Sequence, residues 1–250
     1  MEVRLDDRVA LVTGASKGIG RAIAAELSAS GARVMLVSRK APALKEAAAD
    51  MPGEVAWHAG NVGDPDAADA AVAATIERFG AVDILVNNAA TNPYVGPLMG
   101  LDVPRAEKTV QVNLIGSLLW TQACWRASMQ ERGGVVLNIS SIGGIRAGRS
   151  QLAWYSATKA ALLHLTQSLA AELGPGVRVN AICPGVVKTD MARALWEADE
   201  AGVAATYPLE RLGVPEDVAT MAAFLVSDAA AWVTGSVFVV DGGVLVGGAR

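Results

Sequence analysis

The sequence predicts an α/β fold in which helices cover both faces of a doubly wound, mainly parallel sheet. Short β-branched runs alternate with longer segments of helical period, and this alternation is typical of β-α-β units. The runs are almost continuously apolar, which indicates strands that are buried on both faces. The 250 residues contain no linker rich in Pro, Gly or Ser and no repeat, so we expect one domain over 1–250.

The first half of the chain supplies four predicted strands and the helices between them. The run RVALVT predicts a buried strand, and Ile19, Ile23 and Leu27 mark one face of the helix that follows it. Asp64 is expected to cap the third helix, with Pro65 in its first turn. The strands are expected at 8–13, 33–37, 54–58 and 82–86, and the helices at 18–30, 42–50 and 64–79.

The second half of the chain continues the same alternation, with one interruption. Leu162, Leu165 and Leu169 lie on one side of a predicted helix, and Pro215 opens the last helix. The strands are expected at 135–140, 177–183 and 237–240, and the helices at 104–131, 152–173 and 215–227. The long excursion at about 189–212 is interpreted as a substrate lid, the alternative being a surface insertion without a ligand role.

The composition argues against nucleic-acid binding, metal binding and membrane association. The net charge is −4 and basic residues are not clustered, so no nucleic-acid partner is expected. Cys124 and Cys183 are predicted to be free thiols, and with only His58 and His164 no metal site is expected. No run of about 18 apolar residues and no signal peptide are evident, so we expect no membrane association and a cytoplasmic location.

A glycine-rich turn follows the first predicted strand and leads directly into a helix. Glycines let the backbone approach a pyrophosphate, and a helix N-terminus offers free N–H groups. This turn therefore predicts a dinucleotide site, although a tight structural turn is the alternative. The predicted cofactor-binding residues of the turn are Gly14, Ser16, Lys17, Gly18, Ile19 and Gly20.

The end of the second strand favours NADP(H) over NAD(H). A carboxylate at this place accepts from the ribose 2′-hydroxyl, but here the strand is followed by Ser38, Arg39 and Lys40. Together with Lys17, these cations suit a 2′-phosphate, which Arg39 can bind through two parallel N–H groups. The alternative is that Arg39 and Lys40 are solvated charges at a helix start.

Two further strand ends complete the predicted cofactor site. Asn61 and Val62 follow the third strand and are placed to meet the adenine. Asn87, Asn88, Ala89 and Ala90 follow the fourth strand, where the small residues leave room for a ribose and Asn87 can support the strand ends.

Tyr155 and Lys159 are one helical turn apart and form the predicted catalytic pair. A lysine ammonium a few Å away is expected to lower the pKa of the tyrosine from about 10, so that it relays protons near neutral pH. Ser141 ends the fifth strand and can hydrogen-bond the substrate oxygen. Asn113, in the long helix, is placed to anchor a water that links Lys159 to solvent.

With these motifs in order, the chain resembles the short-chain dehydrogenase/reductase family over nearly its whole length. The resemblance implies a Rossmann-like seven-stranded sheet and a catalytic tetrad of Asn113, Ser141, Tyr155 and Lys159. It also implies that Tyr155 and Lys159 contact the cofactor and that the chain forms a homotetramer or homodimer. The segments that carry the resemblance are 13–20, 87–90, 140–141, 184–185, 233–235 and 240–243, together with Asn113, Tyr155, Lys159 and Thr189. Further cofactor contacts are implied at Pro184, Gly185, Val187 and Thr189.

The substrate side is less defined by the sequence. Asn61 stands where the family usually has Asp, and Arg146 and Arg149 border the substrate pocket of relatives. These arginines are expected either to meet an anionic substrate or to be exposed to solvent. The residues expected to line a partly apolar pocket are Tyr94, Val95, Trp154, Met191, Leu195 and Trp196.

The main functional hypothesis is an NADPH-dependent reductase acting on a small-molecule ketone or aldehyde. A 3-oxoacyl-carrier-protein reductase is an alternative, because Arg132 can help to dock an acidic carrier and the 211–217 tail resembles that group. The same tail is shared by many xenobiotic carbonyl or sugar dehydrogenases. The segment 173–176 offers no second cation, which argues against this role. An alternative of another class, a non-catalytic NADP(H) sensor or scaffold, commonly lacks tetrad members, whereas all four are present.

Overall fold

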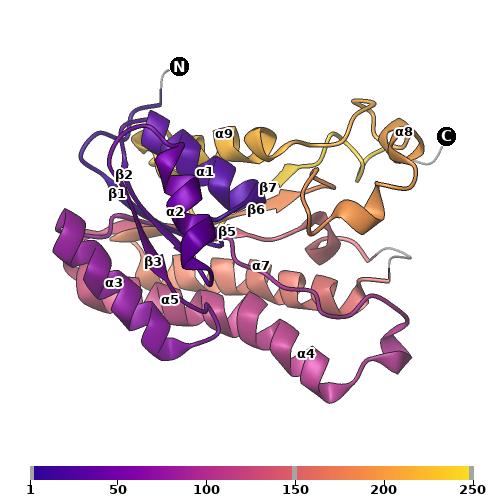
Figure 1. Cartoon of the computed structure of the whole chain (residues 1–250), viewed down its shortest axis with the longest axis horizontal. Coiled ribbons are helices and arrows are strands. Elements are labelled where there is room, and N and C mark those ends of the chain that lie inside the picture. Colours follow the sequence, from indigo (N-terminus) through magenta and orange to yellow (C-terminus); the bar gives the residue numbers. More distant parts are fainter. Residues whose placement is uncertain (1–2, 148–150, 248–250) are drawn as a thin grey trace.

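The computed structural model describes residues 3–147 and 151–247. Its seven strands form one all-parallel sheet of order β3-β2-β1-β4-β5-β6-β7, which confirms the predicted Rossmann-like fold (Figure 1). Strands that are consecutive in the chain are neighbours in the sheet, except for β3 and β4, because β4 pairs with β1. The strands are β1 (Val9–Thr13), β2 (Arg33–Ser38), β3 (Val55–Ala59), β4 (Ile84–Asn87), β5 (Gly134–Ile139), β6 (Val177–Pro184) and β7 (Val237–Val240).

Helices cover both faces of the sheet and enclose two apolar cores. One core joins α1, α2 and α9 to the strands, and the other joins α3, α5 and α7 to the opposite face (Figure 1). Trp120 is fully buried in the second core, where its indole N–H donates to the Val62 carbonyl at 3.1 Å. These helices are α1 (Gly18–Ala29), α2 (Ala41–Ala49), α3 (Pro65–Phe79), α5 (Gly116–Cys124), α7 (Ala153–Leu173) and α9 (Pro215–Val226).

The long helix expected at 104–131 is helical throughout but is not a regular α-helix. It runs through α4 (Val103–Val110), α5 and α6 (Gln130–Arg132), with π-helical segments at Gln111–Ile115 and Trp125–Met129. π-segments insert an extra residue into a helical turn and occur frequently at functional sites. Asn113 lies in the first of them, facing α7.

The predicted lid contains little regular structure. A 3₁₀ turn at Arg193–Leu195 and the short helix α8 (Glu200–Ala205) lie between β6 and α9, at the side of the molecule where the strands end (Figure 1). Further 3₁₀ turns are Leu98–Gly100, Ile142–Gly144 and Asp228–Ala230. Within the described ranges, no helix has both the length and the apolar character that a membrane span requires.

Candidate active site

The carboxyl ends of the strands gather the residues that the sequence singled out. In open parallel sheets, ligands bind outside these ends, at the point where the strand order reverses. Here the reversal lies between β1 and β4, so the glycine turn after β1 meets the segment after β4. The site is built outward from this crevice.

The glycine turn leaves no room for side chains at two of its positions. Gly14 has φ +66°, and a Cβ there would lie 2.9 Å from the Ala89 Cα. A Cβ on Gly20 would lie 2.6 Å from the Gly14 carbonyl oxygen. The turn is therefore packed closely against the end of β4.

Among the residues that the structure describes, no side chain caps the N–H donors in the first turn of α1. Lys17 is the N-cap residue, it makes no side-chain capping bond, and the first turn contains no acidic residue. A helix N-terminus of this kind carries a partial positive charge and binds anions. The cradle formed by Gly14, Gly18, Ile19 and Gly20 therefore fits the diphosphate of a dinucleotide.

Hydrogen bonds fasten the end of β4 to the glycine turn. The Thr13 hydroxyl accepts from the backbone N–H groups of Asn88 at 3.0 Å and Ala89 at 3.1 Å. The Asn88 side chain donates to the Thr13 carbonyl at 2.9 Å. Asn88 thus supports the turn, a role that its position in the sequence did not reveal. Asn87 donates to Asn138 at 3.0 Å, in agreement with the expected support of the strand ends.

The predicted 2′-phosphate site contains three exposed cations, and Lys17 alone among them is paired with a described carboxylate. Ser38 lies 3.1 Å from Ser16, oxygen to oxygen, which joins the end of β2 to the glycine turn. Arg39 and Lys40 follow, and neither makes an ion pair with another described residue. Lys17 is different, because its ammonium lies 2.8 Å from a carboxylate oxygen of Asp190.

Asn61 and Val62 lie beyond the end of β3. The Asn61 side-chain oxygen accepts from the Gly63 N–H at 3.3 Å, so the amide is partly committed to its own turn. Val62 is buried, and its carbonyl receives the Trp120 indole N–H. The predicted contact of Asn61 with adenine stays a prediction.

The segment after β6 closes the other side of the crevice. The Gly185 N–H donates to the Val240 carbonyl at 3.0 Å, and Val187 bridges to Gly213. Thr189 reaches the glycine turn, since a Cβ on Gly18 would lie 3.2 Å from its methyl carbon. The predicted cofactor residues after Pro184 therefore border the same crevice as the turn.

Lys159 lies inside the protein, beside Tyr155. Only 2% of Lys159 is exposed, and its ammonium donates to the Ile139 carbonyl at 2.7 Å. The same nitrogen lies 5.7 Å from the centre of the Tyr155 ring. Ser140 donates to the Lys159 carbonyl at 2.9 Å, and Ser141 at the end of β5 accepts from the Gly143 N–H at 3.1 Å. Three predicted catalytic residues thus meet at the junction of β5 and α7.

Asn113 is joined to the same region by its side chain. Its amide nitrogen donates to the Thr91 carbonyl at 3.0 Å and to the Thr158 hydroxyl at 3.1 Å, and its oxygen accepts from the Thr91 N–H at 2.8 Å. The Thr158 hydroxyl in turn donates to the Tyr155 carbonyl at 2.7 Å. Asn113 therefore braces the turn of α7 that carries Tyr155 against the loop after β4. Thr91 and Thr158 were not singled out from the sequence.

The pKa of Tyr155 is shifted in the opposite direction to the expectation. Burial of the hydroxyl raises the pKa of Tyr155 to about 12, and the nearby Cys183 thiol acts in the same direction. Burial also lowers the pKa of Lys159 to about 8, against a smaller upward effect of Cys183. The expected lowering by the ammonium is wrong for this structure, because desolvation of both groups is the larger effect. The Tyr155 hydroxyl is therefore protonated at neutral pH.

The shifted pKa of Lys159 makes the stability of the ligand-free protein depend on pH. The folded state releases this proton near pH 8, whereas the unfolded chain keeps it to about 10.5. Between these values the unfolded state binds more protons, so stability rises with pH, by at most about 1.4 kcal/mol per pH unit. Above pH 10 the raised pKa of Tyr155 acts against this rise.

We expect the variant Lys159→Met to lack this rise. In urea unfolding, the free energy of unfolding of the parent minus that of the variant should increase as the pH is raised from 8 to 10. A constant difference between the two proteins across this range would contradict the lowered pKa of Lys159.

The predicted pocket residues before α7 are held by local contacts. The Tyr94 hydroxyl donates to the Pro97 carbonyl at 2.6 Å, and its ring lies 4.6 Å from the Arg105 guanidinium carbon. Val95 is exposed. The Trp154 indole N–H donates to the Ala106 carbonyl of α4 at 3.0 Å. Tyr94 and Trp154 therefore have their polar atoms occupied by protein.

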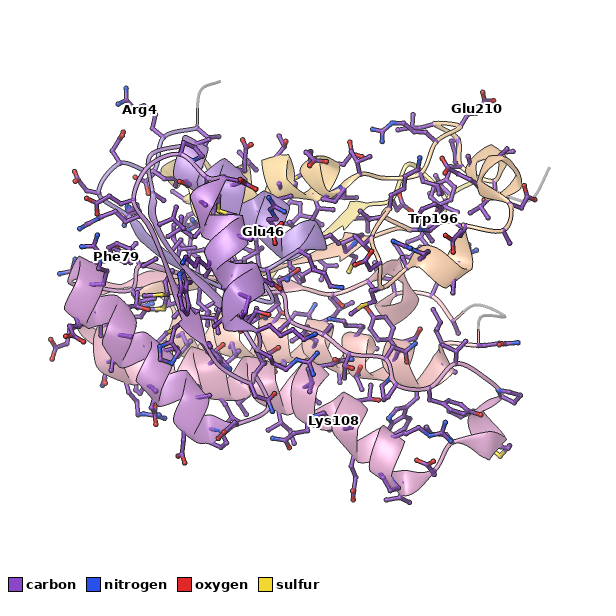
Figure 2. The ribbon with its side chains drawn as sticks, in the orientation of Figure 1. Arg4, Glu46, Phe79, Lys108, Trp196 and Glu210 are labelled. Carbon is purple, nitrogen blue, oxygen red and sulfur yellow. The ribbon has the colours of Figure 1, made fainter. Side chains whose placement is uncertain are left out.

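The predicted pocket residues of the lid include one polar atom without a partner. Met191 and Leu195 are exposed, whereas the indole nitrogen of Trp196 is buried and has no hydrogen-bond partner within the described part of the chain. Figure 2 shows Trp196 in the lid, far from Phe79 at the end of α3. Arg146 donates to the Leu245 carbonyl at 3.0 Å, and Arg149 lies outside the described residues.

The fold and the glycine turn define an α/β protein of the dinucleotide-binding class. A family model described as "Enoyl-(Acyl carrier protein) reductase" matches residues 14–245. The chain belongs to the short-chain dehydrogenase/reductase family and has the fold of its oxidoreductases. This family binds a nicotinamide cofactor.

Relatives with curated names are similar over almost all of the chain. The chain is 39% identical to dehydrogenase/reductase SDR family member 4 of Bos taurus, covering 96% of this chain and 88% of the relative. It is 40% identical to L-rhamnose 1-dehydrogenase (NAD(P)(+)) of Azotobacter vinelandii, covering 97% and 98%.

Solved structures agree with this assignment. A glucose/ribitol dehydrogenase-type member from Brucella melitensis superposes with a TM-score of 0.92 at 33% identity, covering 98% of this chain and 99% of that one. A short-chain type dehydrogenase/reductase from Mycobacterium ulcerans gives a TM-score of 0.92 at 36% identity, covering 97% and 91%.

Proposed function

We propose that this protein is an NADP(H)-dependent carbonyl reductase that transfers a hydride between the nicotinamide and a ketone, aldehyde or secondary alcohol. The observation that carries the proposal is the meeting of Tyr155, buried Lys159 and Ser141 where β5 ends and α7 begins. Tyr155 and Ser141 are the proton donor and the hydrogen-bonding partner that a carbonyl oxygen requires. Arg39 and Lys40 support the choice of NADP(H).

In the proposed reduction, the bound cofactor supplies the hydride and the protein supplies the proton. Tyr155, protonated at neutral pH, donates its hydroxyl proton to the carbonyl oxygen as negative charge develops there. Ser141 holds the same oxygen by a hydrogen bond. Lys159 returns a proton to Tyr155, and its pKa of about 8 allows this exchange near neutral pH. Oxidation of an alcohol runs these steps in reverse.

Asn113 has a positioning role in this proposal. Its side chain is occupied by Thr91 and Thr158, so it sets the position of the α7 turn that carries Tyr155 and Lys159. Its backbone lies in a π-helical segment, where the regular carbonyl pairing of an α-helix is interrupted. We propose that a water held there links Lys159 to solvent.

We expect Arg39→Ala to weaken NADPH binding about tenfold and to leave NADH binding nearly unchanged, because only NADPH carries the 2′-phosphate. Fluorescence titration of both cofactors measures this ratio. Lys45→Ala, which removes an exposed cation from α2, is the control for net charge. A parent that prefers NADH, or an equal loss of both cofactors, would contradict the proposed phosphate site.

A second candidate is a 3-oxoacyl-carrier-protein reductase. The matching family model is described as an enoyl-acyl-carrier-protein reductase, which names the same carrier but a different acyl group. Arg132, the cation considered for carrier docking, lies 3.8 Å from the Asp83 carboxylate, which partly neutralises it. A non-catalytic sensor is disfavoured, because the four tetrad residues lie close together.

Several wider features belong to the same proposal. We propose one domain over 1–250 with a substrate lid at about 189–212. A homotetramer or homodimer is supported by exposed apolar residues near the edge strand β7, where Trp232 is fully exposed and Val239 is 44% exposed. The expected cytoplasmic location stays a prediction, as does the absence of nucleic-acid and membrane partners.

A further inference from the structure

An ion pair joins the base of the lid to the glycine turn. The Lys17 ammonium lies 2.8 Å from Oδ2 of Asp190, and the two residues are 173 positions apart in the chain. Lys17 is the N-cap residue of α1. Asp190 directly follows Thr189, whose methyl carbon would lie 3.2 Å from a Cβ added to Gly18. The two sides of the cofactor crevice are thus fastened at its rim.

The carboxylate of Asp190 forms ion pairs with two cations. While Oδ2 faces Lys17, Oδ1 lies 2.8 Å from a guanidinium nitrogen of Arg193, which opens the 3₁₀ turn of the lid. The pKa of Asp190 is lowered, first by its hydrogen bond to Lys17 and then by the charges of Lys17 and Arg193. If Lys17 turned away, the carboxylate would still have a partner in Arg193.

Lys17 is able to leave this pair at little cost. Its side chain is 70% exposed and that of Asp190 is 53% exposed, and exposed ion pairs contribute little free energy. Lysine also carries its charge on a flexible stem, so the ammonium can rotate toward another anion. A dianionic phosphate attracts it more strongly than a single carboxylate does.

We propose that Asp190 sets the cofactor preference by competing with the 2′-phosphate of NADP(H) for Lys17. This inference rests on the proposed function, in which Lys17, Arg39 and Lys40 form the phosphate site. While Asp190 holds Lys17, the phosphate is left mainly to the two exposed cations after β2. NADP(H) binding draws Lys17 away from the lid base, whereas NAD(H) binding leaves the pair with Asp190 intact.

The test uses Asp190→Asn and compares adenosine 2′,5′-bisphosphate with adenosine 5′-monophosphate by calorimetry. We expect the variant to bind the bisphosphate and NADPH about two- to fivefold more tightly than the parent, as for release of an exposed ion pair. Binding of the monophosphate and NADH should be unchanged. Glu197→Gln removes the same charge from the lid at a residue without an ion pair among those described, and should have no such effect.

Two further variants separate competition for Lys17 from a general change in the lid. In a Lys17→Gln background, Asp190→Asn should no longer improve bisphosphate binding, and Asp190→Glu should behave like the parent. Equal tightening of both nucleotides, or an effect that persists without Lys17, would overturn the inference. If Arg39→Ala weakens the bisphosphate but Asp190→Asn leaves it unchanged, the inference alone fails. If neither Arg39→Ala nor Asp190→Asn changes the preference for the bisphosphate, both the inference and the proposed phosphate site are wrong.

Discussion

Replacement of Tyr155 by Phe should reduce kcat for ketone reduction about 100- to 10,000-fold. The change removes one oxygen atom, and with it the proton that the developing alkoxide requires. Since the pKa of Tyr155 is raised to about 12, the hydroxyl is protonated over the whole neutral range, and the loss should not depend on pH there. The measurement is steady-state kinetics followed by the absorbance of the reduced nicotinamide.

The same variant should leave the framework of the site intact. Thr158 bonds the backbone carbonyl of Tyr155, and Lys159 bonds Ile139, so neither contact needs the phenol oxygen. We therefore expect NADPH to bind the variant with an unchanged Kd. Ser168→Ala is the comparison, because it removes an exposed hydroxyl from α7 that, among the described residues, bonds only the His164 carbonyl of its own helix, and it should turn over like the parent. Parent-like turnover by Tyr155→Phe would show that another group protonates the substrate.

Replacement of Gly14 by Ala should abolish measurable dinucleotide binding. The new methyl group would lie 2.8 Å from the Asn88 side chain and 2.9 Å from the Ala89 Cα, and the backbone there has φ +66°. Because one of these contacts is with backbone, the turn must move away from β4, which disturbs the pyrophosphate cradle. Strain of this kind costs about 1–3 kcal/mol of stability. Titration with NADPH and thermal unfolding measure the two effects.

Gly80→Ala is the matched control for this prediction. Gly80 caps the end of α3 with φ +90°, but a Cβ there would meet no atom of the described residues within 4 Å, its chain neighbours aside. The control therefore carries the same left-handed backbone cost, about 1 kcal/mol, without the steric contact. NADPH should bind Gly80→Ala as it binds the parent. Equal loss of binding in both variants would mean that destabilisation, and not the shape of the cradle, is responsible.

The succession of strands and main helices along the chain could be predicted from local patterns in the sequence. Apolar strand runs and helix caps are short-range features, and the Asp64 side chain does accept from the Asp66 N–H at 3.1 Å, as a cap residue does. The strand expected from Val82 begins at Ile84 instead. The Val82 N–H donates to the hydroxyl of Ser128, a partner 46 residues away in the chain.

Other features of the site depend on contacts that no local pattern contains. The π-helical segment around Asn113 interrupts a sequence that has an ordinary helical period. The spacing of Tyr155 and Lys159 shows that they are neighbours, but it does not show that both are desolvated, so the direction of the tyrosine pKa shift was missed. Asp190 was not singled out, because its partner Lys17 lies 173 positions away in the chain.

The central claim is that this protein moves a hydride from NADPH to a carbonyl carbon. Incubation of the full chain with NADPH deuterated at the reactive position of the nicotinamide, and with a panel of ketones and aldehydes, tests it directly. Mass spectrometry of the products should find one deuterium on the carbinol carbon of an alcohol that the parent forms and that Tyr155→Phe forms far more slowly. Products without deuterium, or no reduction of any carbonyl by a parent that binds NADPH, would contradict the claim.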